Sequence, residues 1–212
     1  MSDARPSLTG WPVNLLIAGR KVVVVGGGRI AARKTAPLLV LGAHVTAVAP
    51  WFADEFPTDL APDLLTIVER EFEPSDLDDA WLVITATDVP AVNHAVYEAA
   101  EARRVWCNSA DDPANCSVTL LSLVRQGDLV VAIGSGGRSP ALATWLKGHV
   151  ASEMGPEYTT LLELLSEERE AIRSAGMSSE DADWQQAFRS GIVDLVRSGR
   201  VDEAREVLRS CL

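Results

Sequence analysis

The stretch from Lys21 to Lys34, KVVVVGGGRIAARK, decides the fold of the first half of the chain. Its four consecutive valines have no polar alternation, which predicts a β-strand covered on both faces, as in a parallel α/β sheet. The glycines that follow allow a tight turn and a close approach of the main chain to a ligand, and the next residues have the apolar spacing of a helix. Because the N-terminus of a helix attracts anions, the stretch predicts a phosphate-binding turn.

The spacing of the small residues narrows the choice of ligand. Gly26, Gly28 and Ala31 match the G-x-G-x-x-G/A pattern of dinucleotide-binding turns, in which the third small residue lets helix and strand pack closely. Taken alone, the pattern also fits a plain connection between a strand and a helix. No Gly-Lys-Ser/Thr sequence follows Gly28, which argues against the phosphate loop of an ATPase. The sequence therefore predicts a dinucleotide site.

Composition excludes several classes of protein. The chain has 212 residues, 47% hydrophobic and 23% charged, which is typical of a globular protein with a full core and a smaller second unit. A net charge of −11 argues against binding to nucleic acids or to membrane surfaces. The 3 cysteines lack C-x-x-C spacing, so they predict neither a disulfide scaffold nor a zinc site. No apolar run approaches the ~20 residues of a membrane span. We therefore expect a cytoplasmic protein.

Strands and helices alternate from the glycine turn to Pro113. This alternation predicts a Rossmann-like, doubly wound parallel sheet over residues 1–113. After Pro113 two apolar runs flank Gln126-Gly127-Asp128, which predicts a hairpin within residues 114–148. Residues 149–212 are predicted to be helical, with acidic first turns and glycine breaks. The strands are expected in KVVVV, HVTAVAP, LLTIVEREF, AWLVITATD and RVWCNSADDP.

Ligands of such a sheet bind beyond the carboxyl ends of its strands. Thr87 and Asp88 follow the fourth strand and are expected to line the cofactor site, although Asp88 is also a candidate cap for the next helix. Many nicotinamide-binding folds carry an acidic residue where Pro50 and Trp51 stand here. NAD is favoured over NADP, because no Arg or Lys follows Pro50 closely. The residues expected to contact the dinucleotide are Gly26, Gly28, Arg29, Ile30, Ala31, Pro50, Trp51, Thr87 and Asp88.

A polar segment, CNSADDPANCS, follows the fifth predicted strand. Its adjacent carboxylates, Asp111 and Asp112, stand near the presumed cofactor crevice and can supply a general acid or base. The alternative is structural, because Asp-Asp-Pro is also good turn chemistry. The sequence has no G-x-S-x-G serine and no H-x-x-x-H pair, so acyl transfer and zinc hydrolysis have no support, and no metal ligands are assigned.

Six segments together resemble a known family. They are GRKVVVVGGGRIAARK, LGAHVTAVAP, WLVITATD, VNHAV, CNSADDP and GSGGRSPALA, and they span Trp11 to His149 in order. They are similar to the dehydrogenase module of sirohaem synthesis, precorrin-2 dehydrogenase, which occurs alone or combined with sirohydrochlorin ferrochelatase activity. The most specific parts are the N-x-x-D-x-P turn and the S-G-G-x-S-P segment.

The resemblance implies an NAD-dependent oxidation of precorrin-2 to sirohydrochlorin, with loss of a hydride to the nicotinamide and of a proton to a base. Asp111 matches the family's essential aspartate, whereas Asp112 stands where members vary. Ser135 matches a serine that is phosphorylated in some relatives. The family pattern also implies a homodimer formed by the segment after Pro113. The residues expected at the tetrapyrrole are Asn108, Ser135, Gly136, Gly137, Arg138 and Ser139.

The charge of the chain complicates this interpretation, because precorrin-2 is a polycarboxylate and a protein of charge −11 repels it. Arg138, with Arg125 and Lys147 nearby in sequence, is expected to compensate locally, and the alternative for Arg138 is a solvated loop charge. Two further hypotheses stay open. One is a bifunctional enzyme that also inserts Fe²⁺, with Asp111 taking up the pyrrole protons. The other is an NAD-sensing module without catalysis.

Overall fold

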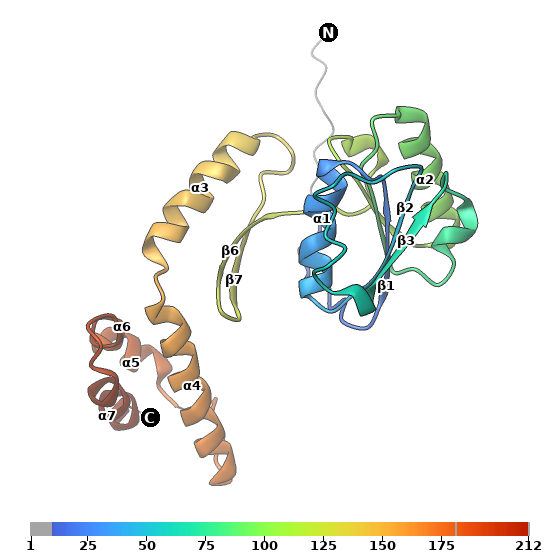
Figure 1. Ribbon diagram of the computed structural model, residues 1–212. Helices are drawn as coiled ribbons and strands as arrows, with labels where there is room; N and C mark the ends of the chain where they lie inside the picture. The colour runs from blue at the N-terminus through green and yellow to red at the C-terminus, as the bar shows by residue number, and fades with distance from the viewer. Residues whose placement is uncertain (1–9, 181, 212) are drawn as a thin grey trace. The chain divides into compact units, whose positions relative to one another are not determined.

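Five parallel strands form the sheet of the first unit in the computed structural model, which describes residues 10–180 and 182–211 (Figure 1). The chain divides into two compact units, Met1–Leu120 and Leu121–Leu212. The strand order is β3-β2-β1-β4-β5, so the predicted doubly wound sheet is confirmed. The finer boundaries at residues 113 and 148 stay predictions. The strands are β1 (Lys21–Val25), β2 (His44–Ala49), β3 (Leu65–Glu69), β4 (Leu82–Thr85) and β5 (Trp106–Ser109).

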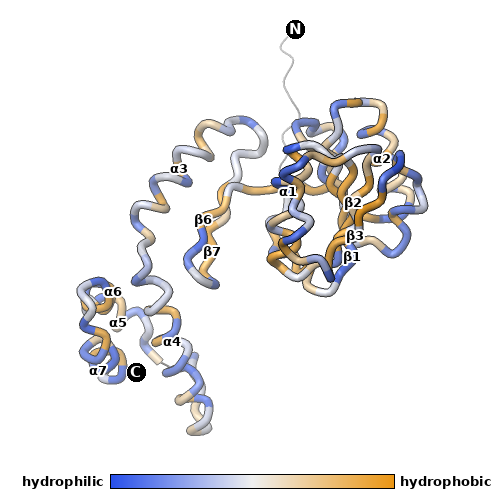
Figure 2. The backbone as a smooth tube through the Cα atoms, in the orientation of Figure 1, coloured by the Kyte–Doolittle hydropathy of each residue, from blue (hydrophilic) through white to orange (hydrophobic). Residues whose placement is uncertain are grey.

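The valines of β1 supply both faces of the sheet. Val22 and Val24 pack into one apolar core with helix α1 (Arg29–Val40), while Val23 and Val25 pack into another with helix α2 (Pro90–Arg103). All four are buried, as the absence of polar alternation predicts. The central strands accordingly form the most hydrophobic part of the tube in Figure 2.

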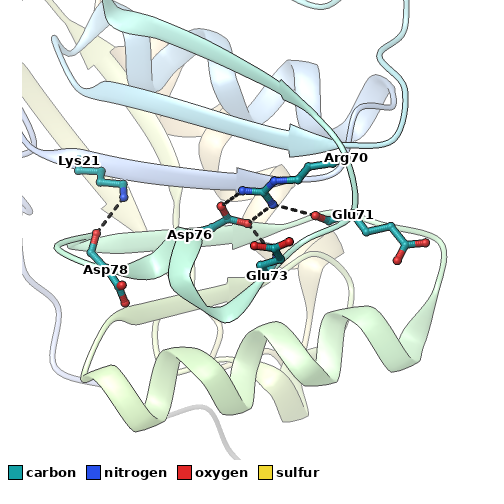
Figure 3. Close-up of polar contacts among 6 residues, drawn as sticks. All are labelled: Lys21, Arg70, Glu71, Glu73, Asp76 and Asp78. Carbon is teal, nitrogen blue, oxygen red and sulfur yellow. Dashed lines mark hydrogen bonds and ion pairs between the residues drawn. The ribbon is translucent and has the colours of Figure 1, made fainter.

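The connection from β3 to β4 carries no α-helix, only the short 3-10 helix η2 (Pro74–Leu77). Another 3-10 helix, η1 (Pro62–Leu64), lies before β3. An ion pair fixes its shape: the Arg70 guanidinium donates to Asp76 at 2.8 Å, and Asp76 also accepts from the Glu73 N–H at 2.9 Å (Figure 3). Leu77, at the end of η2, is fully buried in the core shared with α2. The connection therefore covers the α2 face of the sheet.

The second unit begins with the predicted hairpin, formed by β6 (Ser122–Gln126) and β7 (Leu129–Ile133). Gly127 takes a left-handed φ of +56° in the turn. Helix α3 (Pro140–Glu153) follows, and then α4 (Glu157–Ser174), α5 (Trp184–Arg189), α6 (Ile192–Arg197) and α7 (Val201–Cys211). The last four helices share a separate core around Leu161, Leu164 and Ile192. Among the described residues, no helix has both the length and the apolar character that a membrane crossing requires.

Candidate functional site

The glycine turn between β1 and α1 packs tightly against two neighbouring loops. Gly26 has a φ of +123°, and a Cβ added there would lie 2.5 Å from the carbonyl oxygen of Ala86. A Cβ on Gly27 would overlap the carbonyl oxygen of Trp51. At Gly28 the nearest heavy atom would be Trp51 Cη2, at 3.9 Å. Two glycines are thus required by the fold, while Gly28 leaves open space beside the backbone.

The N-terminus of α1 has the features of an anion site. Gly28 is the N-cap, no side chain caps the helix, and its first turn has no acidic residue, so the first N–H groups remain available to a ligand. Ala31 is buried and lets α1 pack closely on the sheet, whereas Ile30 is exposed. Arg29 forms an ion pair with Glu55, with 3.2 Å between Nε and Oε1. A cofactor pyrophosphate fits these residues.

Hydrogen bonds join the loops at this edge of the sheet. The N–H of Ala53 donates to Gly27 at 2.8 Å, which ties the loop after β2 to the glycine turn. The N–H of Ala86 donates to the main-chain carbonyl of Val25 at 2.8 Å, and the N–H of Ala110 donates to the main-chain carbonyl of Thr85 at 2.9 Å. The predicted residues after β1, β2, β4 and β5 are therefore brought together. Pro50 and Trp51 are exposed there, Trp51 by 62%.

The turn after β4 is held by a residue that sequence reasoning missed, Asn93 of α2. Its Oδ1 accepts from Thr85 Oγ1 at 2.6 Å and from Thr87 Oγ1 at 2.8 Å, and its Nδ2 donates to the Thr87 carbonyl at 3.0 Å. The hydroxyl of Thr87 also accepts from the Val89 N–H at 3.2 Å. Asp88 is exposed, and the N-cap of α2 is Val89, so the capping alternative for Asp88 is wrong.

Asp111 and Asp112 differ in their surroundings. Asp111 is exposed in the turn after β5 and has a left-handed φ of +59°. Asp112 accepts a 2.6 Å hydrogen bond from Asn115 Nδ2, in the 3-10 helix η3 (Pro113–Asn115). The structural alternative, in which Asp-Asp-Pro serves only to form a turn, therefore accounts for the backbone conformation of both residues. It also accounts for the side-chain hydrogen bond of Asp112.

The residues around this turn are mostly buried. Asn108 is 7% exposed, and its Nδ2 donates to the Val118 carbonyl at 3.0 Å. Ser109 is 3% exposed, and its hydroxyl has no partner among the described residues. Burial raises the pKa of the Cys107 thiol to about 12, and burial also raises the pKa of Cys116. Both thiols are therefore protonated near neutral pH and are poor nucleophiles.

The predicted substrate loop belongs to the second unit. Gly136 and Gly137 have left-handed φ values of +58° and +72°. The Ser135 hydroxyl accepts from the Ser139 N–H at 3.2 Å, and Ser139 caps α3 by accepting from the Leu142 N–H at 3.2 Å. Arg138 is exposed and makes no ion pair with another described residue. Within the described ranges, no group of three His, Cys, Asp or Glu side chains is placed to hold a metal ion.

The sheet order, the glycine turn and the open helix N-terminus define a Rossmann-like dinucleotide-binding protein. A family model described as "Putative NAD(P)-binding" matches residues 13–122, which confirms a nicotinamide dinucleotide as the predicted kind of cofactor. The chain is 32% identical over 203 residues to the siroheme synthase of Photorhabdus laumondii, covering 95% of this chain and 43% of that protein. It is 45% identical over 136 residues to siroheme synthase 2 of Cronobacter sakazakii, and this match covers 64% of this chain and 30% of that protein.

A solved structure titled "SirC, precorrin-2 dehydrogenase" is similar over nearly its whole length. The TM-score is 0.74 with 28% sequence identity, and the match covers 95% of this chain and 98% of that one. The chain belongs to the precorrin-2 dehydrogenase family, as its motifs predict. It spans less than half of the length of the two curated siroheme synthases, at 43% and 30%.

Proposed function

We propose that this chain catalyses the NAD-dependent dehydrogenation of precorrin-2 to sirohydrochlorin in sirohaem biosynthesis. The observation that carries the proposal is the similarity to SirC, precorrin-2 dehydrogenase, over 95% of this chain and 98% of that one. The exposed carboxylate of Asp111, next to the strand ends that form the cofactor edge, is consistent with that chemistry. An NAD-sensing module would need neither this carboxylate nor the loop at residues 135–139.

NAD, when bound, supplies the hydride acceptor, and the chain binds and orients it. The first N–H groups of α1 bind the pyrophosphate, and Gly28 leaves the backbone accessible. The Arg29–Glu55 pair places one charge of each sign beside the N-terminus of α1 and therefore favours neither cofactor. The proposal of NAD rests on the sequence, in which no Arg or Lys follows Pro50 closely. Thr87 and Asp88 form the wall of the crevice beyond β4.

The oxidation removes a hydride and a proton from the substrate. We assign the proton to Asp111, whose exposed carboxylate is free to accept it. Asp112 is the weaker candidate, because its Oδ2 already accepts from Asn115 at 2.6 Å. Asn108 is proposed to contact the tetrapyrrole, as its place in the family motif implies.

The substrate's carboxylates need cations, which the net charge of −11 makes scarce. Arg138 is proposed to bind one of them, and Ser135, Gly136, Gly137 and Ser139 to shape the loop around it. We also propose a homodimer formed through the β6–β7 hairpin, where Leu123 and Val130 are exposed. The cytoplasmic location stays a prediction.

An anaerobic assay tests the proposed reaction. Precorrin-2 with NAD should give the absorption spectrum of sirohydrochlorin together with NADH, and NADP should support a slower reaction. NAD binding without any spectral change would favour the sensing module instead. Sirohydrochlorin with Fe²⁺ tests the bifunctional alternative in the same apparatus.

Asp111→Asn tests the assigned base. Asparagine tolerates the left-handed backbone and keeps the shape of the side chain, but it cannot accept the proton. We expect kcat to fall by about 10²-fold or more, the usual contribution of a positioned general base, with NAD affinity unchanged. Asp112→Asn is the matched control and should change kcat much less. The assignment fails if Asp112→Asn is the more damaging change, or if chelation is lost while dehydrogenation survives in Asp111→Asn.

A further inference from the structure

Asn93 is a buried amide on an otherwise apolar face of α2. It is 6% exposed, and it shares that face with Val96 and Ala100, which are fully buried against the sheet. A buried amide costs free energy unless its hydrogen bonds are made inside the protein. An apolar residue would serve packing alone better, so the partners of Asn93 indicate what it does.

All of these partners lie at the end of β4. Both ends of the amide bind Thr87: Oδ1 accepts from its hydroxyl at 2.8 Å and Nδ2 donates to its carbonyl at 3.0 Å. Oδ1 also accepts from the Thr87 main-chain N–H at 3.4 Å. A further bond, from Thr85 Oγ1 at 2.6 Å, holds Oδ1 in place from within the strand. The main chain of Thr87 is therefore fixed from α2, 6 residues further along the sequence.

The segment that Asn93 holds packs against the cofactor turn. Ala86, the residue before Thr87, donates its N–H to Val25 at 2.8 Å. The carbonyl oxygen of Ala86 is the atom that a Cβ on Gly26 would approach to 2.5 Å. Strands β1 and β4 are neighbours where the strand order reverses, which is where open α/β sheets bind their ligands. A shift of Thr87 would therefore move one wall of the dinucleotide crevice.

We propose that Asn93 is a positioning residue for NAD. It holds residues 86–88 against the glycine turn, so that the crevice has its binding shape before the cofactor arrives. It acts through Thr87 and needs no contact of its own with cofactor or substrate. The inference rests on NAD binding and not on the oxidation of a tetrapyrrole.

The test compares two variants that each weaken the same buried network. Asn93→Asp keeps the size and the acceptor oxygen but replaces the Nδ2 donor with a second oxygen, which repels the Thr87 carbonyl. Thr85→Val is the matched control, because it removes one bond to Asn93 and leaves the bonds between Asn93 and Thr87 intact. Both changes are expected to lower the Tm.

Only Asn93→Asp should weaken NAD binding, by about three- to tenfold, as expected when a hydrogen bond that shapes the site is lost. Titration calorimetry with NAD alone measures this loss of affinity, at a temperature well below the Tm of the less stable variant. Hydrogen exchange at Thr87 and Val89 should also accelerate in Asn93→Asp and not in Thr85→Val. If Asn93→Asp does not fold, Asn93→Ser takes its place with the same expectation. An NAD affinity equal to that of the parent, or an equal loss in both variants, would overturn the proposal and leave the proposed reaction untouched.

Discussion

Replacing Gly28 with valine tests the dinucleotide site with little disturbance to the fold. Gly28 has φ −78° and ψ −178°, an extended conformation that valine adopts readily. The added Cβ would meet only Trp51 Cη2, at an ordinary contact distance of 3.9 Å. Gly26 and Gly27 offer no such test, because a Cβ on either one would strike main-chain oxygen atoms.

The expected losses of stability and of binding differ widely. Valine is a poorer N-cap than glycine, so folding should lose about 1 kcal/mol and the Tm should fall by about 2–4 °C. The isopropyl group would keep the first N–H groups of α1 away from the pyrophosphate. Hydrogen bonds to charged groups contribute about 1.5–3 kcal/mol each, so losing two should weaken NAD binding by at least about 100-fold.

Titration calorimetry with NAD and thermal unfolding measure the two effects on one preparation. Gly28→Ala provides a graded comparison and should weaken binding less, because a methyl group projects less far. Gly27→Ala should show the opposite pattern and lose its folding first, since its Cβ overlaps the Trp51 carbonyl. A folded Gly28→Val that binds NAD with the parent affinity would refute the placement of the pyrophosphate.

Three further changes probe the rest of the molecule. Burial opposes ionisation of Asp76, but the hydrogen bonds from Arg70 and from the Glu73 N–H outweigh burial and lower the pKa of Asp76. Because Arg70→Met removes one of these partners, it should lower the Tm at pH 7. That Tm difference should be constant above the unfolded pKa of about 3.9 and shrink as the pH falls through the lower folded pKa; a constant difference down to pH 2 would contradict it. Ser109→Ala removes a hydroxyl that has no described partner, so its Tm should equal or exceed that of the parent, and a clear fall would reveal a missing bond. Arg138→Glu should raise the KM for the tetrapyrrole by about tenfold or more and leave the KM for NAD unchanged, whereas equal effects would place Arg138 elsewhere.

The parts of the fold that repeat a local pattern could be predicted from the sequence. Val22–Val25 are apolar without alternation, and both faces of β1 are covered. The glycine turn and the hairpin turn at Gly127 each need a backbone that glycine supplies most readily, so each marks its own place in the sequence. These signals are local, and therefore one sequence is enough to interpret them.

The polar partners across the sheet could not be predicted in the same way. Thr85 and Thr87 both follow the apolar part of β4 in the sequence, yet Thr85 is fully buried and binds Asn93. The spacing of Asn93, Val96 and Ala100 on one helix face was a usable signal, because an amide on a buried face must find partners. It indicates that partners exist but not which residues they are, since that depends on how α2 lies on the sheet.

Asp111 and Asp112 show how backbone conformation separates two identical side chains. A left-handed φ of +59° costs a residue other than glycine about 1 kcal/mol or more, although aspartate tolerates it better than most. Asp112, one residue on, returns to a φ of −129° and places its carboxylate within 2.6 Å of Asn115 Nδ2. The turn therefore places the Asp112 carboxylate in a hydrogen bond within the loop and leaves the Asp111 carboxylate exposed beside the strand ends. Alanine at position 111 would remove the carboxylate and also disfavour the turn, so a rate lost in that variant would have two causes. Asparagine separates them, which is why the test of the proposed base depends on Asp111→Asn.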